Sequence, residues 1–204
     1  MVGDYAFANC SVLTNINMPA CSAIGECAFQ NCFSLASVSF PACSTIGYSA
    51  FYKCSNLTTV SFPTCISLEN SAFVFCNKLT SVNFPICSTI GSHAFSGCFS
   101  LVSVNFPVCT TIGSYAFKGC FNLSTVNFPA CRIIGNSAFF NCSLTSVSFP
   151  VCTTIGTYAF CACNALTSVN FPTCSTIGHC AFLSCDGLAT LILPACATIS
   201  TNAF

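Results

Sequence analysis

The stretch Cys32–Phe51, CFSLASVSFPACSTIGYSAF, contains the pattern from which the fold can be predicted. Its first half places Leu35, Val38 and Phe40 in a run that ends with alternating apolar and polar residues. Such alternation is typical of a strand with one buried face. Pro41 follows directly, and because proline has no N–H to donate, it closes the strand.

The second half of the pattern continues to Cys54 and has a different period. Ile46, Ala50, Phe51 and Cys54 are spaced as on one face of a helix, but over only about two turns. This spacing predicts a short helical or 3-10 turn. Gly47 follows Ile46, and glycine suits a tight bend there.

The same pattern recurs along the whole chain. The dipeptide Ala-Phe occurs ten times, with every step 22 residues except one of 21. A fixed period in the twenties indicates one structural unit stacked on copies of itself, which is a solenoid. We therefore expect residues 1–204 to form a single solenoid of about ten 22-residue repeats without obvious caps.

The one short step falls after Cys142. Leu144, Val147 and Phe149 keep the apolar spacing of the other repeats, so the missing residue should come from the connection before the strand. A slip of one residue would turn this apolar set outward. We expect the strand to keep its register, with Phe149 buried.

The complete pattern, Leu-x-x-Val-x-Phe-Pro-x-Cys followed by Ile-Gly-x-x-Ala-Phe-x-x-Cys, resembles the BspA-like, or Treponema-type, leucine-rich repeat. The resemblance covers all ten recurrences. It implies a curved solenoid with a parallel β-sheet on the concave face, and we place the short helical or 3-10 turns on the convex face. The chain departs from the common pattern because Phe replaces Leu at the strand end and Cys follows Pro-x.

Composition excludes several classes of function. The chain is 54% hydrophobic and only 4% charged, with a formal net charge of zero. Phosphate backbones require clustered Lys and Arg, so we expect no nucleic-acid partner. Polar residues interrupt every apolar run before it could span a membrane. Low net charge favours association between copies.

Most of the 21 cysteines form two ladders with the repeat period. One ladder follows Ala-Phe and the other follows Pro, while Cys27, Cys161 and Cys180 stand outside both. The ladders occupy apolar positions, which favours buried, reduced thiols. Disulfides between stacked neighbours and metal binding stay open as alternatives, and the three out-of-phase cysteines could pair.

The polar residues of the strands are expected to face solvent and to form a candidate binding surface. One interpretation is that these residues only solvate the sheet, with an amide ladder through Asn83, Asn105 and Asn127. The other interpretation is that they bind a protein, a glycan or ice. The candidate positions are Asn15, Asn17, Ser37, Ser39, Thr59, Ser61, Ser81, Asn83, Ser103, Asn105, Thr125, Asn127, Ser146, Ser148, Ser168, Asn170 and Thr190.

The two ends form a second candidate surface. A solenoid without capping repeats exposes its core at each end, and stacking of copies head to tail would cover both ends and generate a filament. The residues expected at such an interface are Val2, Phe7, Ile192, Ile199 and Phe204.

Two hypotheses for function follow. The family resemblance implies a cell-surface or extracellular protein that serves adhesion or protein binding, and the first residues contain no signal peptide. The alternative is a self-assembling structural subunit. We expect no enzyme, catalytic residue, metal or cofactor, since no nucleophile–base pair stands out and only four residues are acidic.

Overall fold

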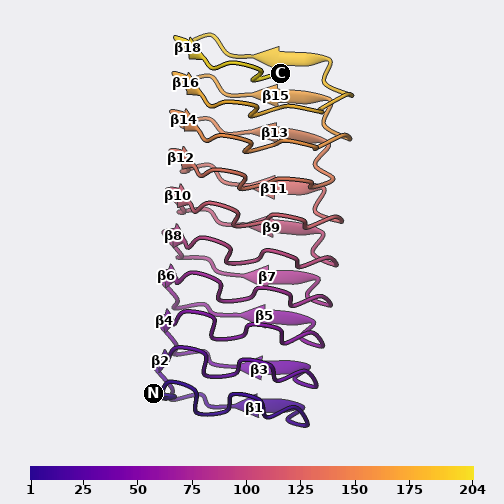
Figure 1. Cartoon of the computed structure of the whole chain (residues 1–204). Helices are drawn as coiled ribbons and strands as arrows, with labels where there is room; N and C mark the ends of the chain where they lie inside the picture. The colour runs from indigo at the N-terminus through magenta and orange to yellow at the C-terminus, as the bar shows by residue number, and fades with distance from the viewer.

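The computed structural model describes residues 1–204 as a stack of similar coils. Each coil contains one strand of three residues and one strand of two residues, joined by turns. The N- and C-termini lie at opposite ends of the stack (Figure 1). The solenoid predicted from the repeat is confirmed, and each strand lies next to its counterpart one repeat away.

The three-residue strands are the ones predicted from the Leu-x-x-Val-x-Phe pattern. They pair in parallel in four groups, β1 with β3, β5 with β7, β9 with β11, and β13 with β15 and β17. Their bounds are β1 Asn15–Asn17, β3 Ser37–Ser39, β5 Thr59–Ser61, β7 Ser81–Asn83, β9 Ser103–Asn105, β11 Thr125–Asn127, β13 Ser146–Ser148, β15 Ser168–Asn170 and β17 Thr190–Ile192.

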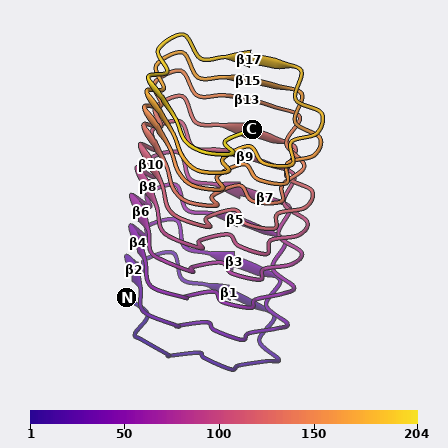
Figure 2. The ribbon, with the colours of Figure 1, turned by 45° about the horizontal axis from the view of Figure 1, so that its top comes forward.

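A second parallel sheet was not predicted. It is formed by two-residue strands after Pro-x-Cys, which pair without interruption in one nine-stranded sheet. Figure 2 shows these strands along one edge of the coils, apart from the three-residue strands. Their bounds are β2 Ala23–Ile24, β4 Thr45–Ile46, β6 Ser67–Leu68, β8 Thr89–Ile90, β10 Thr111–Ile112, β12 Ile133–Ile134, β14 Thr154–Ile155, β16 Thr176–Ile177 and β18 Thr198–Ile199.

The helical or 3-10 turns expected in the other half of the repeat do not form. Residues such as Cys27 (φ 50°) and Asn31 (φ 60°) take left-handed backbone conformations, one before each Ala-Phe and one before each ladder Cys that follows it. These residues reverse the helical progression twice per coil. In return, backbone N–H groups in the turn point to the next coil, for example from Phe29 to the Ala50 carbonyl at 2.8 Å.

Two columns of phenylalanine rings form the core. The ring after each Ala stacks on the next one, as in Phe95 and Phe117 with centroids 5.3 Å apart and planes 9° apart. The strand-end rings form a second column, and the two columns meet edge to face, for example Phe106 and Phe117 at 6.5 Å. Such aromatic pairs add about 0.5–1.5 kcal/mol each beyond their buried area.

Close packing of successive backbones, and not a left-handed conformation, explains the glycine after Ile. A Cβ atom on Gly47 would lie 2.7 Å from the carbonyl carbon of Gly25 in the preceding coil. A side chain on Gly47 would therefore press on the preceding coil, although Glu69 and Ser200 are accommodated at the equivalent position of two other repeats.

The shortened repeat keeps its strand in register, as predicted. Ser146, Val147 and Ser148 of β13 lie opposite Ser168, Val169 and Asn170 of β15. Leu144 and Phe149 are both fully buried. The missing residue is absorbed between Cys142 and Leu144, before the strand begins.

The ladder cysteines are buried except at the ends, where Cys10 is exposed and Cys196 is half-buried. All are free thiols, and all except Cys10 donate a hydrogen bond to a backbone carbonyl, from Cys21 near one end to Cys196 near the other. Cys54 Sγ donates to the Phe29 carbonyl of the preceding coil at 3.1 Å, and Cys43 Sγ donates to the Thr45 carbonyl of its own coil at 3.1 Å. Cysteine thus supplies a small apolar side chain with one weak donor.

Candidate binding surfaces

The polar positions of the three-residue strands form one continuous surface, which we call the strand face. It consists of the seventeen residues predicted from the sequence, and all of them are exposed except Ser168 and Asn170, which are half-buried. None of them is charged. The side chains lie in register along the stack, as shown by the pairing of Thr125 with Ser103 and of Asn127 with Asn105.

The amide ladder expected on the strand face forms only in part. Asn127 Nδ2 donates to Asn105 Oδ1 at 2.8 Å, but Asn83 Nδ2 donates to Ser61 Oγ at 3.0 Å. The two bonds lie within the strand pairs β9–β11 and β5–β7, and the ladder stops where these pairs end. The strand face therefore has many hydroxyl and amide groups that are open to solvent.

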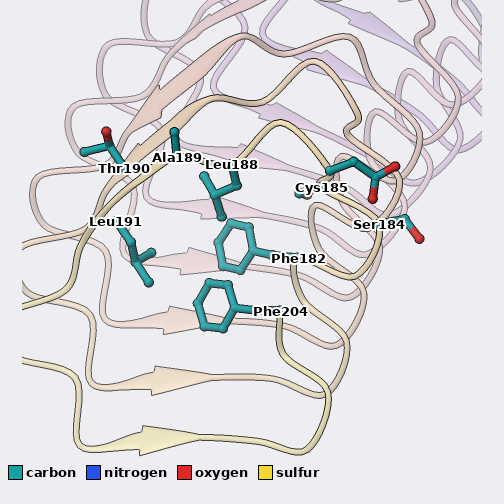
Figure 3. Close-up of a pocket in the computed structure, with 9 residues that line it drawn as sticks. Phe182, Ser184, Cys185, Leu188, Ala189, Thr190, Leu191 and Phe204 are labelled. Carbon is teal, nitrogen blue, oxygen red and sulfur yellow. The ribbon is translucent and has the colours of Figure 1, made fainter.

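The C-terminal end of the stack exposes apolar side chains. Ile192 is 47% exposed, Ile199 55% and Phe204 46%. A hollow of about 370 Å³ lies at the same end of the stack, lined by Phe182, Leu188, Leu191 and Phe204 among others. Figure 3 shows the rings of Phe182 and Phe204 stacked side by side, with Leu188 and Leu191 beside them.

The N-terminal end differs from the sequence-based expectation in one residue. Val2 is only 3% exposed, because it joins the two-residue sheet by a parallel bridge to Ile24. Phe7 is half-buried and stacks on Phe29 at 5.2 Å. Val2 therefore belongs to the core, and the exposed apolar group beside it is Met1 at 82%.

The backbone polar groups of the turns at the two ends are opposite in kind. Every turn donates N–H groups to the next coil, so the first coil leaves the carbonyls of Ala6 and Ala8 without a partner. The last coil leaves the N–H groups of Asn202 and Phe204 without a partner. In the turns, one end thus offers acceptors and the other offers donors, whereas the connections before the strands run the opposite way and leave the Thr14 N–H open at the first coil and the Ala197 carbonyl open at the last.

A third surface, on the turns, was not predicted as a site. We call it the aromatic strip, and it consists of Phe33, Lys53, Phe75, Phe99, Lys118 and Phe121. Its four phenylalanines are between 37% and 48% exposed. They replace the polar residues, glycine or alanine found at the same positions in other repeats, and these replacements were the only sign of the surface in the sequence. The geometry of the turns brings these phenylalanines close to one another in space.

Two adjoining hollows lie along the aromatic strip and share Phe75. One has a volume of about 410 Å³ and is lined by Phe33, Lys53, Ser55, Phe75 and Asn77. The other has about 230 Å³, and its lining includes Phe75, Phe99 and Lys118. The Phe75 and Phe99 centroids are 6.5 Å apart, and Phe99 stacks on Phe121 at 5.3 Å.

The cations of the strip lie over aromatic rings. Lys53 Nζ is 5.2 Å from the Tyr52 centroid, and Lys118 Nζ is 5.4 Å from that of Tyr115. His93 stacks on Tyr115 at 4.6 Å. Burial, together with the Lys118 charge, lowers the pKa of His93 below its ordinary value. The lysines therefore carry the positive charge of this surface at neutral pH.

The three out-of-phase cysteines are buried within the turns. Cys180 Sγ lies 3.1 Å from Nε2 of His179, and burial and the Cys180 charge raise the pKa of Cys161. No group of three or more His, Cys, Asp or Glu side chains has the arrangement of a metal site. No helix of the structure has the length and apolar character needed to cross a membrane.

The comparisons with known proteins agree with the repeat and the fold. The family model described as the BspA type leucine rich repeat region matches residues 1–108 and 88–204. The chain belongs to this family. No curated protein matches the chain.

Solved structures of bacterial leucine-rich repeat proteins share the fold. The Treponema pallidum leucine rich repeat protein is 29% identical, with 69% of this chain and 68% of that chain covered and a TM-score of 0.65. A leucine-rich repeat protein from Bacteroides ovatus is 21% identical, with coverage of 98% and 69% and a TM-score of 0.61. A leucine rich cell surface protein from Faecalibacterium prausnitzii is 23% identical, with coverage of 94% and 62% and a TM-score of 0.57.

Proposed function

We propose that the protein is a non-enzymatic binding module of the cell surface or extracellular space, and that it binds other proteins through the strand face. The observation that carries the proposal is the strand face itself, with seventeen uncharged polar side chains in register and exposed or half-buried. Open hydroxyl and amide groups on a rigid scaffold can form hydrogen bonds with a partner without the entropic cost of ordering long side chains. Membership of the BspA type family and likeness to a cell surface protein support the location.

The proposal is tested by adhesion of beads coated with the purified chain to immobilised extracellular-matrix proteins. Two substitutions at mid-stack, Ser103→Arg with Asn105→Arg, place bulky charges on the strand face and should abolish adhesion. Ser100→Arg, which lies outside the strand face, is the matched control and should leave adhesion unchanged. Adhesion no stronger than that of albumin-coated beads, or loss of adhesion in the control as well, would contradict the proposal.

The second candidate function is self-assembly into filaments by head-to-tail stacking. The specific observation in its favour is that one end offers free carbonyls, at Ala6 and Ala8, and the other offers free N–H groups, at Asn202 and Phe204. The exposed side chains of Ile199 and Phe204 add apolar surface, at about 25 cal/mol per Å² before the entropic costs of association. Such an interface is heterologous and continues indefinitely unless it closes into a ring.

Sedimentation at increasing concentration tests self-assembly. The wild-type chain should form assemblies that grow with concentration, and Phe204→Lys with Ile199→Lys should sediment as a monomer. Ser103→Lys with Asn105→Lys, on the strand face, is the matched control and should not change sedimentation. A monomeric wild type, or assembly by the end variant, would rule out this candidate.

A further inference from the structure

We propose that the aromatic strip on the turns is a second binding site, which takes an acidic oligosaccharide. This site lies apart from the strand face and does not depend on the function proposed for that face. The two adjoining hollows along the strip have volumes of about 410 and 230 Å³ and share Phe75 as a common wall. Together they form an extended, open site that suits a chain of small rings.

The first argument is that the exposed phenylalanines lie outside the hydrophobic core. Core packing is complete without them, since the two buried phenylalanine columns run inside the coils. Phe75 is 39% exposed and Phe99 is 37% exposed. Contiguous exposed apolar side chains rimmed by polar groups mark interaction sites.

The second argument is the conformation of Phe75. Its φ of 58° lies in the left-handed region, which is unfavourable for a bulky side chain. The same position holds Asn9, Asn31 and Asn141 in other repeats, and asparagine tolerates this conformation better. Phe75 is nevertheless accommodated, because Gly97 in the next coil has no Cβ: such an atom would lie 2.5 Å from the Phe75 ring.

The third argument is charge. Two of the chain's four basic residues, Lys53 and Lys118, line the hollows, and no acidic residue lines either of them. In a chain with only 4% charged residues, this concentration of positive charge favours an anionic ligand. The hydroxyl of Ser55 and the amide of Asn77 add hydrogen-bonding groups to the larger hollow.

The kind of ligand follows from these groups together. The C–H face of a pyranose ring packs on an aromatic ring, and a uronic acid carboxylate pairs with a lysine ammonium. The coils repeat about every 4.8 Å, which is close to the length of one sugar with its linkage. A polypeptide is disfavoured, because the turn N–H groups already bond to the next coil, as Phe73 does to Ala94 at 2.8 Å.

The test uses a hexamer of galacturonic acid and its methyl ester, which differ only in charge, in calorimetric titrations of the full chain. The acidic hexamer should bind and the ester should bind at least about tenfold more weakly. Phe75→Asn, which installs the residue of other repeats, should weaken binding of the acidic hexamer about tenfold or more, on the scale of one aromatic contact and its buried area. Lys53→Asn with Lys118→Ser should abolish the preference for the acid over the ester.

Two matched variants separate this site from the rest of the surface. Lys78→Asn removes a positive charge that lines neither hollow, and Asn105→Arg alters the strand face; both should bind the hexamer within about twofold of wild type. Thermal unfolding confirms that each variant is folded. Equal binding of acid and ester, unchanged binding by Phe75→Asn, or loss of binding through Asn105→Arg alone would overturn the proposal.

Discussion

An interior coil and the last coil carry nearly the same sequence but differ in burial. Ile155 of β14 is fully buried, whereas Ile199 of β18, its counterpart two coils further on, is 55% exposed. Val147 of β13 is 4% exposed, and the equivalent Leu191 of β17 is 45% exposed. A repeat does not bury its apolar side chains by itself; the neighbouring coil buries them. Stability therefore resides in the contacts between coils.

The largest difference between interior and end positions is expected in thiol reactivity. In native buffer, Cys10 should react with a thiol reagent rapidly, because it is exposed. The interior ladder thiols should react only after unfolding, more slowly by a factor of about 10³ or more. Mass spectrometry of the labelled chain measures both. Fewer than about half of the thiols released in denaturant without reductant would show that disulfides are present.

Alkaline pH should destabilise the interior coils. Burial raises the pKa of Cys43 from 9.0 to about 11 and that of Cys65 to about 12. A raised pKa means that the neutral thiol is favoured in the folded state. This stability is complete below pH 9 and is lost as the pH rises toward 12, because the unfolded chain ionises first.

Denaturant midpoints between pH 8 and 11 measure this loss. A variant with Cys43→Ala and Cys65→Ala should show a shallower decline than the wild type over the same range. A midpoint that stays constant up to pH 11 would contradict the burial of the thiols.

Removal of one stacked ring should cost far more inside the stack than at its end. Phe95→Ala leaves a cavity between two neighbouring rings and should lower the free energy of unfolding by about 3–5 kcal/mol. Phe204→Ala removes a ring that stacks only on Phe182 and is 46% exposed, so about 1–2 kcal/mol is expected. Chemical denaturation of both variants gives the comparison. Equal losses would show that coils do not stabilise one another through this column.

A methyl group on the glycine column should show the same contrast on a smaller scale. Gly113→Ala would place Cβ 2.6 Å from the backbone of Gly91, and we expect a loss of about 1–3 kcal/mol. Gly3→Ala is the matched control, because nothing lies within 4 Å of its added Cβ. The unfolding midpoint of Gly3→Ala should equal that of wild type. A neutral Gly113→Ala would mean that the coils separate without cost.

The smallest effect is expected on the strand face. Asn127→Ser removes the exposed hydrogen bond to Asn105 and should change the free energy of unfolding by less than about 0.5 kcal/mol. Thermal unfolding measures the change. A loss above 1 kcal/mol would show that the strand face is a structural element and would weaken its assignment as a binding surface.

Much of the fold could be predicted because its causes are periodic. Phe40, Cys43 and Phe51 recur in every repeat or nearly so, and each is buried as its phase indicates. The helical turn was predicted wrongly, because the spacing of Ile46, Ala50 and Phe51 also fits a turn interrupted by left-handed residues. Hydrogen bonds to the next coil favour the turn with left-handed residues. These bonds join residues of different repeats, so the spacing of residues within one repeat could not predict them.

Of the candidate surfaces, too, one could be predicted from the sequence and another could not. The strand face was predicted residue by residue, since alternation along a strand decides which side chains point outward. The aromatic strip was not, because Phe75, Gly97 and Phe99 are unremarkable as separate departures from the repeat. They become a surface only when the turns bring them within contact distance.

The sequence by itself determined the period, the apolar phase of each strand, the polar strand face and the family. The tertiary structure alone decided that the second half of the repeat forms a nine-stranded sheet with left-handed turns, and that Val2 is buried. It also decided that the glycine column serves close approach of backbones. The physical reason is that these features depend on contacts between residues about 22 positions apart, whereas sequence patterns report the preferences of residues within one coil.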